Sequence, residues 1–209
     1  MNNIHITEHP LVQHKLTVMR DKDTGAKEFR ELVCEITTML GYEATKDITL
    51  TEIEVQTPVA TARSKVVKGA KLALVPVLRA GLQMVDGFLN LVPAAKVGHL
   101  GIYRDSESGE NVEYYCKMPV DVSERDVFVL DPLIATGHSV VAAVDKVKSF
   151  NPRSIKLLSI VASPEGLDVF RKAHPEVEVY LASLDEGLTE NGFIIPGVGD
   201  AGNRLYGTK

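Results

Sequence analysis

The 209-residue sequence has only two cysteines, Cys34 and Cys116, and they form no Cys-x-x-Cys spacing. This scarcity argues against a disulfide framework or a structural zinc site and fits a reducing compartment. No apolar stretch approaches the ~18 to 20 residues that a membrane span needs. The first residues, MNNIHITEHPLVQHK, lack the apolar segment of a signal peptide. We therefore expect a cytoplasmic protein without a membrane partner.

Positive charge is also scarce. The net charge is −5, and no run of lysine or arginine exceeds two residues. Because proteins that bind nucleic-acid phosphates usually carry a basic face, we expect no nucleic-acid partner. The sequence has no repeat, no low-complexity segment and no linker that would divide it. Its length suits one domain with a substantial core, and we expect a single domain over residues 1–209.

Short apolar segments alternate with segments of helical spacing. The spacing of apolar residues predicts helices, and continuous or alternating apolar runs predict strands. Helices are expected over 8–21, 26–44, 82–92, 139–150 and 164–175, and strands over 52–62, 71–81, 94–105, 112–119, 125–133, 153–163 and 177–184. This alternation is typical of an α/β fold with a doubly wound, mainly parallel sheet flanked by helices. Ligands of such sheets bind at the carboxyl ends of the strands, beside the topological switch point.

The segment VFVLDPLIATGHSV, residues 127–140, joins a predicted buried strand to a predicted helix. Residues 136–139 fall at the first turn of that helix, where free N–H groups and the helix dipole favour an anion. Gly137 lets the backbone approach closely, and Asp131 at the strand end supplies an acceptor. The pattern predicts a sugar phosphate. The alternative is that Thr136 or Ser139 merely caps the helix and Asp131 is an ordinary loop carboxylate. Neither GxxxxGK[ST] nor GxGxxG occurs.

Three segments together resemble a known family. The segment DPLIATGHS (131–139), which begins with Asp131, resembles the phosphoribosyl-diphosphate signature of the type I phosphoribosyltransferases. Pro132 stands where a second acid is usual in that signature. PVLRAGLQM (76–84) resembles the diphosphate loop of the uracil phosphoribosyltransferase branch. GFIIPGVGDAGNRLYGT (192–208) resembles the uracil-binding segment of that branch. The resemblance covers essentially the whole chain.

The resemblance implies a reaction in pyrimidine salvage, in which uracil and 5-phosphoribosyl 1-diphosphate give UMP and diphosphate. Substitution at C1 of the ribose passes through a cation-like centre, so catalysis means stabilising the leaving charge and aligning the base. No protein nucleophile is needed, and the sequence contains no GxSxG motif.

The resemblance also assigns residues. It implies that Arg79 and Arg104 hold the diphosphate, that Asp131 binds the ribose hydroxyls, and that Asp200 lies between base and diphosphate; these four are the expected catalytic residues. The expected phosphoribosyl-diphosphate site is Arg79, Arg104, Asp131, Pro132, Leu133, Ile134, Ala135, Thr136, Gly137, His138, Ser139 and Asp200. The expected uracil site is Ile194, Gly199, Asp200 and Ala201. Mg²⁺ is the expected cofactor, held mainly by the diphosphate, with Asp200 as a candidate ligand. The alternatives are surface salt bridges for the two arginines and a glycine-rich turn for the C-terminal segment.

Two positions depart from the pattern of the branch. His138 stands where glycine is common, and Asn203 stands where aspartate is usual. We assign His138 no catalytic role, because an imidazole there would point to solvent while the backbone N–H binds. The polar loop from Asp105 to Asn111 is the expected flexible hood that excludes water. The resemblance further implies a homodimer or homotetramer and, in some members, activation by GTP.

Three other functions stay open at this point. A regulator that binds phosphoribosyl diphosphate and RNA would carry paired acids and a basic face. A phosphoribosyltransferase for another base would keep residues 131–139 and change the segment around Ile194. A catalytically inactive interaction module would not need both arginines and both acids.

Overall fold

The computed structural model describes residues 3–69, 71–104 and 111–208, the side chain of Arg104 excepted. Its central sheet is mainly parallel, as the sequence predicts, and only the last pair of strands is antiparallel. In spatial order the sheet runs β1 (Ile4–Ile6), β11 (Glu178–Leu184), β10 (Ser154–Ala162), β8 (Asp126–Leu130), β4 (Leu72–Leu78), β6 (His99–Arg104) and β7 (Asn111–Lys117). Strands β4 and β8 are buried along almost their whole length, which explains their continuous apolar sequences.

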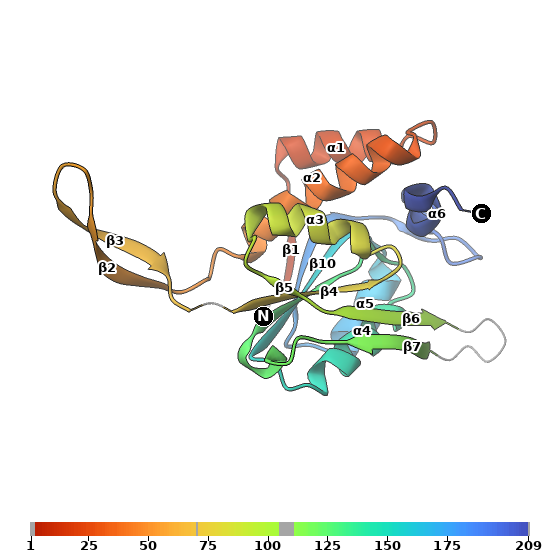
Figure 1. Ribbon diagram of the computed structural model, residues 1–209. Helices are drawn as coiled ribbons and strands as arrows, with labels where there is room; N and C mark the ends of the chain where they lie inside the picture. The colour runs from red at the N-terminus through yellow and green to blue at the C-terminus, as the bar shows by residue number, and fades with distance from the viewer. Residues whose placement is uncertain (1–2, 70, 105–110, 209) are drawn as a thin grey trace.

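Helices cover both faces of this sheet (Figure 1). One face carries α1 (Pro10–Arg20), α2 (Ala26–Ala44) and α3 (Leu82–Leu91), and the other carries α4 (His138–Lys148) and α5 (Pro164–Ala173). Two apolar clusters form accordingly. Phe29, Phe88 and Phe128 are almost fully buried in the first, and Phe170 is fully buried in the second.

The topological switch point lies between β4 and β8. From β4 the chain continues through α3 to β6 on one side, whereas from β8 it continues through α4 to β10 on the other. The carboxyl ends of β4 and β8 therefore diverge into separate loops, and a crevice at this place is the usual ligand site of such sheets. Arg79 follows the first strand and Asp131 follows the second.

The segment predicted as one strand over 52–62 is instead a two-stranded arm. Strands β2 (Leu50–Gln56) and β3 (Thr61–Val67) pair with each other, form their own sheet and extend away from the body (Figure 1). The prediction was wrong about the length of the strand and about the strand that it pairs with. Alternation of apolar and polar residues indicates a strand with one polar and one apolar face, but it does not indicate the pairing partner.

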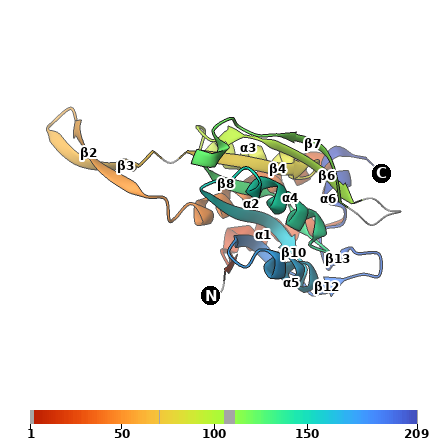
Figure 2. The same cartoon turned by 90° about the horizontal axis from the view of Figure 1, so that it is seen from below.

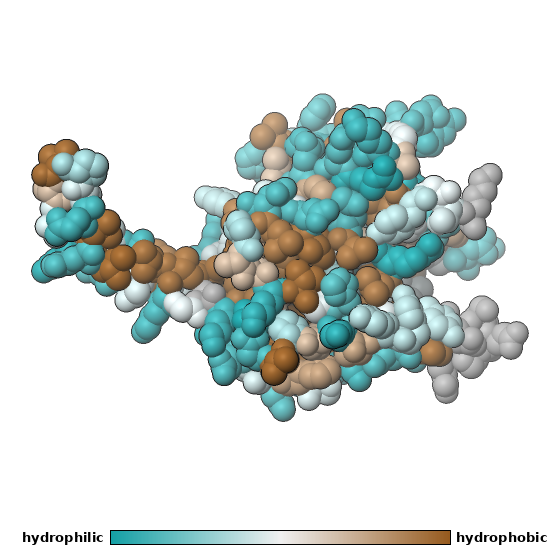
Figure 3. All heavy atoms as spheres, in the orientation of Figure 1, coloured by the Kyte–Doolittle hydropathy of each residue, from teal (hydrophilic) through white to brown (hydrophobic). Residues whose placement is uncertain are grey.

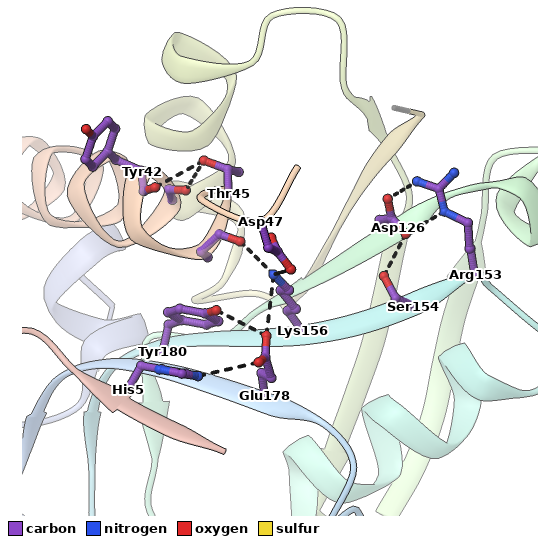
Figure 4. Close-up of polar contacts among 12 residues, drawn as sticks. His5, Tyr42, Thr45, Asp47, Asp126, Arg153, Ser154, Lys156, Glu178 and Tyr180 are labelled. Carbon is purple, nitrogen blue, oxygen red and sulfur yellow. Dashed lines mark hydrogen bonds and ion pairs between the residues drawn. The ribbon is translucent and has the colours of Figure 1, made fainter. Parts of the chain in front are cut away.

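A buried lysine fixes the root of this arm (Figure 4). Lys156 on β10 donates to the carbonyl of Ala44 at 2.9 Å and to the carboxylate of Asp47 at 2.7 Å. Glu178 on β11 lies 3.4 Å from the same ammonium. Because Ala44 ends α2 and Asp47 leads into β2, these contacts tie the chain to the sheet just before the arm begins. Nearby, Arg153 pairs with Asp126 at the start of β8.

The remaining elements are short. They are β5 (Lys96–Val97), a 3₁₀ turn at Val122–Glu124, β9 (Leu133–Ile134), the strands β12 (Gly187–Leu188) and β13 (Ile194–Ile195), and α6 (Ala201–Tyr206). Strands β12 and β13 form a small hairpin near the amino end of α5 (Figure 2). Among the described residues, no helix is long and apolar enough to cross a membrane.

Candidate active site

The loop after β4 is brought against the end of β8 by a glycine. A side chain at Gly81 would overlap the carbonyl oxygen of Leu130 and the backbone of Val77. Only glycine therefore permits this approach, which places the loop beginning at Arg79 next to Asp131. The side chain of Arg79 is exposed at this edge and lines a cavity there.

The turn after β8 has the geometry that an anion site requires. Gly137 adopts a left-handed conformation (φ 81°) as the N-cap of α4, and a side chain there would overlap the carbonyl of Gly166 at the start of α5. Thr136, Gly137 and Ser139 line a small cavity of about 120 Å³ together with Asp131. The N–H groups of the first turn of α4 have no acceptor among the described residues, and this turn lines a space of phosphate size.

The Asp131 carboxyl group lies where this small cavity meets a larger one. It accepts a weak hydrogen bond from the N–H of Leu133 at 3.4 Å. Burial raises the pKa of Asp131 to about 7, and the Leu133 contact offsets only part of the rise. Donors such as sugar hydroxyls would favour its charged form.

The larger cavity, of about 320 Å³, lies between the β4 loop, the β8 loop and the C-terminal segment. Ile194 forms a buried part of its wall, and Gly199 adopts a left-handed conformation (φ 75°) that exposes the backbone. Asp200 caps α6 by accepting from the N–H of Asn203 at 2.8 Å. The lining residues are Arg79, Ala80, Asp131, Pro132, Leu133, Ala135, Gly192, Phe193, Ile194, Gly199, Asp200, Ala201 and Gly202.

Two arginines hold the C-terminal segment in place. Arg20 on α1 forms a two-pronged pair with Asp185 (2.6 and 2.7 Å) and donates to the carbonyl of Gly197 at 2.8 Å. Arg204 on α6 donates to the carbonyls of Met19 and Val198 at 2.7 and 2.9 Å. These contacts fasten the segment to the opening helices of the chain, so one wall of the cavity depends on residues that are 165 to 185 positions apart in sequence.

Comparison with known proteins identifies the family. The family model described as uracil phosphoribosyltransferase matches residues 6–208. The chain belongs to the uracil phosphoribosyltransferase family. Uracil phosphoribosyltransferase of Clostridioides difficile (strain 630) is 58% identical over 209 residues, and that of Thermoanaerobacter sp. (strain X514) is 56% identical over 207 residues; both alignments cover at least 99% of each chain.

Solved structures share the fold of this chain. The AQ2163 protein from Aquifex aeolicus superposes with a TM-score of 0.91 at 40% identity, covering 97% of each chain. A hypoxanthine phosphoribosyltransferase from Staphylococcus aureus superposes with a TM-score of 0.52 at 15% identity, covering 87% of this chain and 84% of its own, which shows a shared fold alone.

The site residues expected from the uracil phosphoribosyltransferase resemblance lie around the two adjoining cavities, with the exception of His138 and Arg104. His138 is exposed and lines neither cavity, while its carbonyl accepts from the side chain of Asn111 at 3.2 Å. The side chain of Arg104 lies outside the described part of the structure, and so do residues 105–110 of the predicted hood, of which only Asn111 is described.

Several cavity residues were not predicted as site residues, notably Ala80, Gly192, Phe193 and Gly202. Phe193 lines the larger cavity although its side chain is apolar and 48% exposed. Larger hollows lie elsewhere. One of about 420 Å³ lies at the arm root and one of about 720 Å³ lies beside α5, and neither is lined by an expected site residue.

The described carboxylates suit a metal that arrives with its substrate. Within residues 3–69, 71–104 and 111–208, no group of three or more His, Cys, Asp or Glu side chains could form a resident metal cage. Asp131 and Asp200 nevertheless line the same cavity. One or two carboxylates beside a diphosphate are the donor set that Mg²⁺ prefers, so the residues present fit this ion.

Proposed function

We propose that this chain catalyses the transfer of a 5-phosphoribosyl group from 5-phosphoribosyl 1-diphosphate to uracil, giving UMP and diphosphate in pyrimidine salvage. The observation that carries the proposal is the pair of adjoining cavities at the β4/β8 switch point. Asp131 lies at their junction, the 136–139 turn lines one cavity, and Arg79, Asp200 and Ile194 line the other. Membership of the family supports the same reaction. We treat residues 1–209 as one catalytic domain.

The small cavity would take the 5-phosphate of the substrate. Backbone N–H groups at the start of α4, the positive end of the helix dipole and the hydroxyls of Thr136 and Ser139 all favour an anion there. The carboxylate of Asp131 would accept hydrogen bonds from the hydroxyls on C2 and C3 of the ribose, whose C5 carries the phosphate. His138 would contribute its backbone only, since its side chain faces solvent.

The diphosphate would leave from the Arg79 side of the larger cavity. A guanidinium stays charged and donates two hydrogen bonds at once to phosphate oxygens, so it stabilises the negative charge that develops on the leaving group. Arg104 is proposed as its partner from the sequence resemblance. Asp200, with Asp131, would hold Mg²⁺ bound to the diphosphate, and that ion supplies further neutralisation of the leaving charge.

Uracil would lie against Ile194 and the backbone of residues 199–201. Uracil offers an O2 acceptor, an N3–H donor and an O4 acceptor along one edge, and uncharged backbone groups can match that order. Cytosine would mismatch at N3 and at position 4. As N1 of uracil bonds to C1 of the ribose, the C1–O bond breaks with its electron pair on the diphosphate, and in the overall reaction the proton lost from N1 is taken up by that diphosphate. The protein's part is alignment and charge stabilisation.

The arm supports a proposal about assembly. Ile53, Val55 and Val66 are exposed and lie on one face of the β2–β3 hairpin, which they share with the half-buried Ala62. Apolar residues are visible along the surface of the arm (Figure 3). The opposite face pairs Glu52 with Lys65 and Glu54 with Arg63, and it exposes Leu50 and Val67 at the root of the arm. An isolated hairpin is marginally stable in water, and an uncovered apolar face usually marks an interface. We therefore propose that the arm packs on a second copy of the chain in a homodimer or homotetramer.

Three further properties stay predictions. We predict that loop 105–111 closes over the ribosyl centre as a hood. We also predict activation by GTP, which is tested by adding GTP to the turnover assay. A cytoplasmic location suits the two free thiols of Cys34 and Cys116.

The experiment is a turnover assay with purified protein, 5-phosphoribosyl 1-diphosphate, Mg²⁺ and each of uracil, cytosine, thymine, adenine, hypoxanthine and xanthine. Diphosphate release is expected with uracil alone. Turnover with another base would retain the phosphate site and refute the assignment of the C-terminal segment. Binding of phosphoribosyl diphosphate without any turnover would refute the enzymatic function and favour a regulator.

A further inference from the structure

The last residue of α6 makes a contact that no expected role accounts for. The Tyr206 hydroxyl donates a hydrogen bond to the carbonyl oxygen of Arg79 at 3.0 Å, across 127 positions of sequence. The Arg79 guanidinium lies 6.0 Å from the centre of the Tyr206 ring, at the outer limit of a cation–π contact. The C-terminal segment, which would read the base, therefore touches the loop that would hold the diphosphate.

The backbone of Tyr206 is fixed from both sides. Arg30 on α2 donates to the carbonyl of the preceding residue, Leu205, at 2.7 Å, and the Leu205 side chain is fully buried. The helix then ends at Gly207, whose left-handed conformation (φ 63°) lets its N–H donate to the carbonyl of Asn203 at 2.8 Å. Because the backbone of Tyr206 is held in this way, its hydroxyl lies in one position. The hydrogen bond from this hydroxyl then restricts the position of the Arg79 carbonyl.

The acceptor belongs to the peptide between two residues that line the larger cavity, Arg79 and Ala80. The Arg79 carbonyl also accepts from the N–H of Leu82 at 3.2 Å, at the start of α3. Two donors therefore fix the plane of the trans peptide between Arg79 and Ala80. In a trans peptide the N–H points opposite to the C=O, so the Ala80 N–H points away from Tyr206. Ala80 lines the larger cavity, and within the described residues its N–H has no acceptor.

We infer that Tyr206 is a positioning residue for the diphosphate, acting through the Arg79–Ala80 peptide so that the Ala80 N–H is available to a diphosphate oxygen. This inference rests on the proposed function. Helix α6 then links the two halves of the site. Asp200 caps its first turn beside the base, and Tyr206 ends it against the diphosphate loop about 9 Å further along the axis.

The test is Tyr206→Phe, which keeps the ring beside Arg79 and removes only the hydroxyl. We expect the KM for phosphoribosyl diphosphate, and the Kd for Mg²⁺-diphosphate by calorimetry, to rise three- to tenfold, as for the loss of one ordinary hydrogen bond. The Kd for UMP and the KM for uracil should change less than twofold, because neither ligand carries a diphosphate. Tyr206→Leu, which also removes the ring, should raise the same two constants further.

The matched control is Tyr42→Phe, which removes a hydroxyl from an exposed tyrosine on α2 and should leave all four constants unchanged. An unchanged Kd for diphosphate in Tyr206→Phe overturns the inference. Equal weakening of UMP and diphosphate also overturns it, because that result indicates general loosening. If the wild-type protein does not turn over uracil, the proposed function fails, while diphosphate binding by calorimetry still tests Tyr206.

Discussion

Asp131 is the residue in which stability and function conflict most clearly. Its carboxyl group is buried enough that the pKa rises to about 7, and the only hydrogen bond that it accepts among the described residues is the weak one from Leu133. A charged carboxylate in such a position destabilises the free protein, yet the proposed substrate supplies the sugar hydroxyls that would satisfy it. Strain of this kind is typical of groups placed for a ligand.

Asp131→Asn is therefore expected to lower activity and raise stability. Loss of the charged acceptor should reduce kcat/KM for phosphoribosyl diphosphate by about 10- to 100-fold. The free energy of unfolding without ligand should exceed that of the wild type at pH 8.5 by about 1–2 kcal/mol, because a buried charge is removed. Steady-state kinetics and urea denaturation measure the two effects.

The sign of the pH dependence follows from the raised pKa of Asp131. The folded-state pKa of Asp131 is about 7, above the ordinary value of 3.8, so the folded protein holds this proton more tightly than the unfolded chain does. The contribution of Asp131 to the free energy of unfolding is therefore fully present below pH 3.8 and is lost as the pH rises through 7. The stability advantage of Asp131→Asn should therefore shrink between pH 8.5 and pH 5.5. Asp168→Asn, at an exposed carboxylate on α5, is the control and should show no such change. A constant difference across this range would contradict the account.

The C-terminal segment shows how a distant contact can set the shape of a site. The Arg204 guanidinium lies over the Phe29 ring at 4.4 Å and donates to carbonyls on the α1–α2 side and within its own segment. Because one side chain joins these parts, the wall formed by the C-terminal segment, where we propose that uracil binds, depends on Arg204 more than the turn at residues 136–139 does.

Arg204→Met keeps the length of the side chain and its contact with Phe29 but removes every donor. We expect the KM for uracil to rise at least tenfold, while the KM for phosphoribosyl diphosphate changes less than threefold. Kinetics with each substrate varied in turn measure the split. Arg171→Met, at an exposed arginine on α5, should leave both constants unchanged. An equal rise of both constants for Arg204→Met would show that the segment does not form a separate wall.

Long elements could be predicted from the sequence and short ones could not. Helix α2 and strands β4 and β8 carry strong periodic signals, and the turn at residues 136–139 follows from its own sequence. Helix α6 contains Gly202 and Asn203 within six residues, so it depends on tertiary contacts that local preference does not reveal. Strand β1 forms only because β11 pairs with it, and Phe193 and Tyr206 reach the site through folding of distant segments.

At the scale of the whole molecule, the arm is the feature that a single chain does not explain. Its apolar face is uncovered, while its charged face carries oppositely charged residues directly across from each other. Ile53→Lys combined with Val55→Lys should convert an assembled protein into a species with the mass of one chain. Sedimentation velocity measures this change, and Glu52→Gln on the other face should preserve the assembly. A wild-type protein that sediments as one chain at micromolar concentration would contradict the proposed interface.

The most direct measurement for the whole account is a crystal structure of the protein with UMP. The account predicts the phosphate of UMP on the turn of Thr136 to Ser139, the ribose hydroxyls on Asp131, and the uracil ring against Ile194 and the backbone of residues 199–201. A phosphate bound elsewhere, or a ring that does not enter the cavity between the β8 loop and the C-terminal segment, would contradict it.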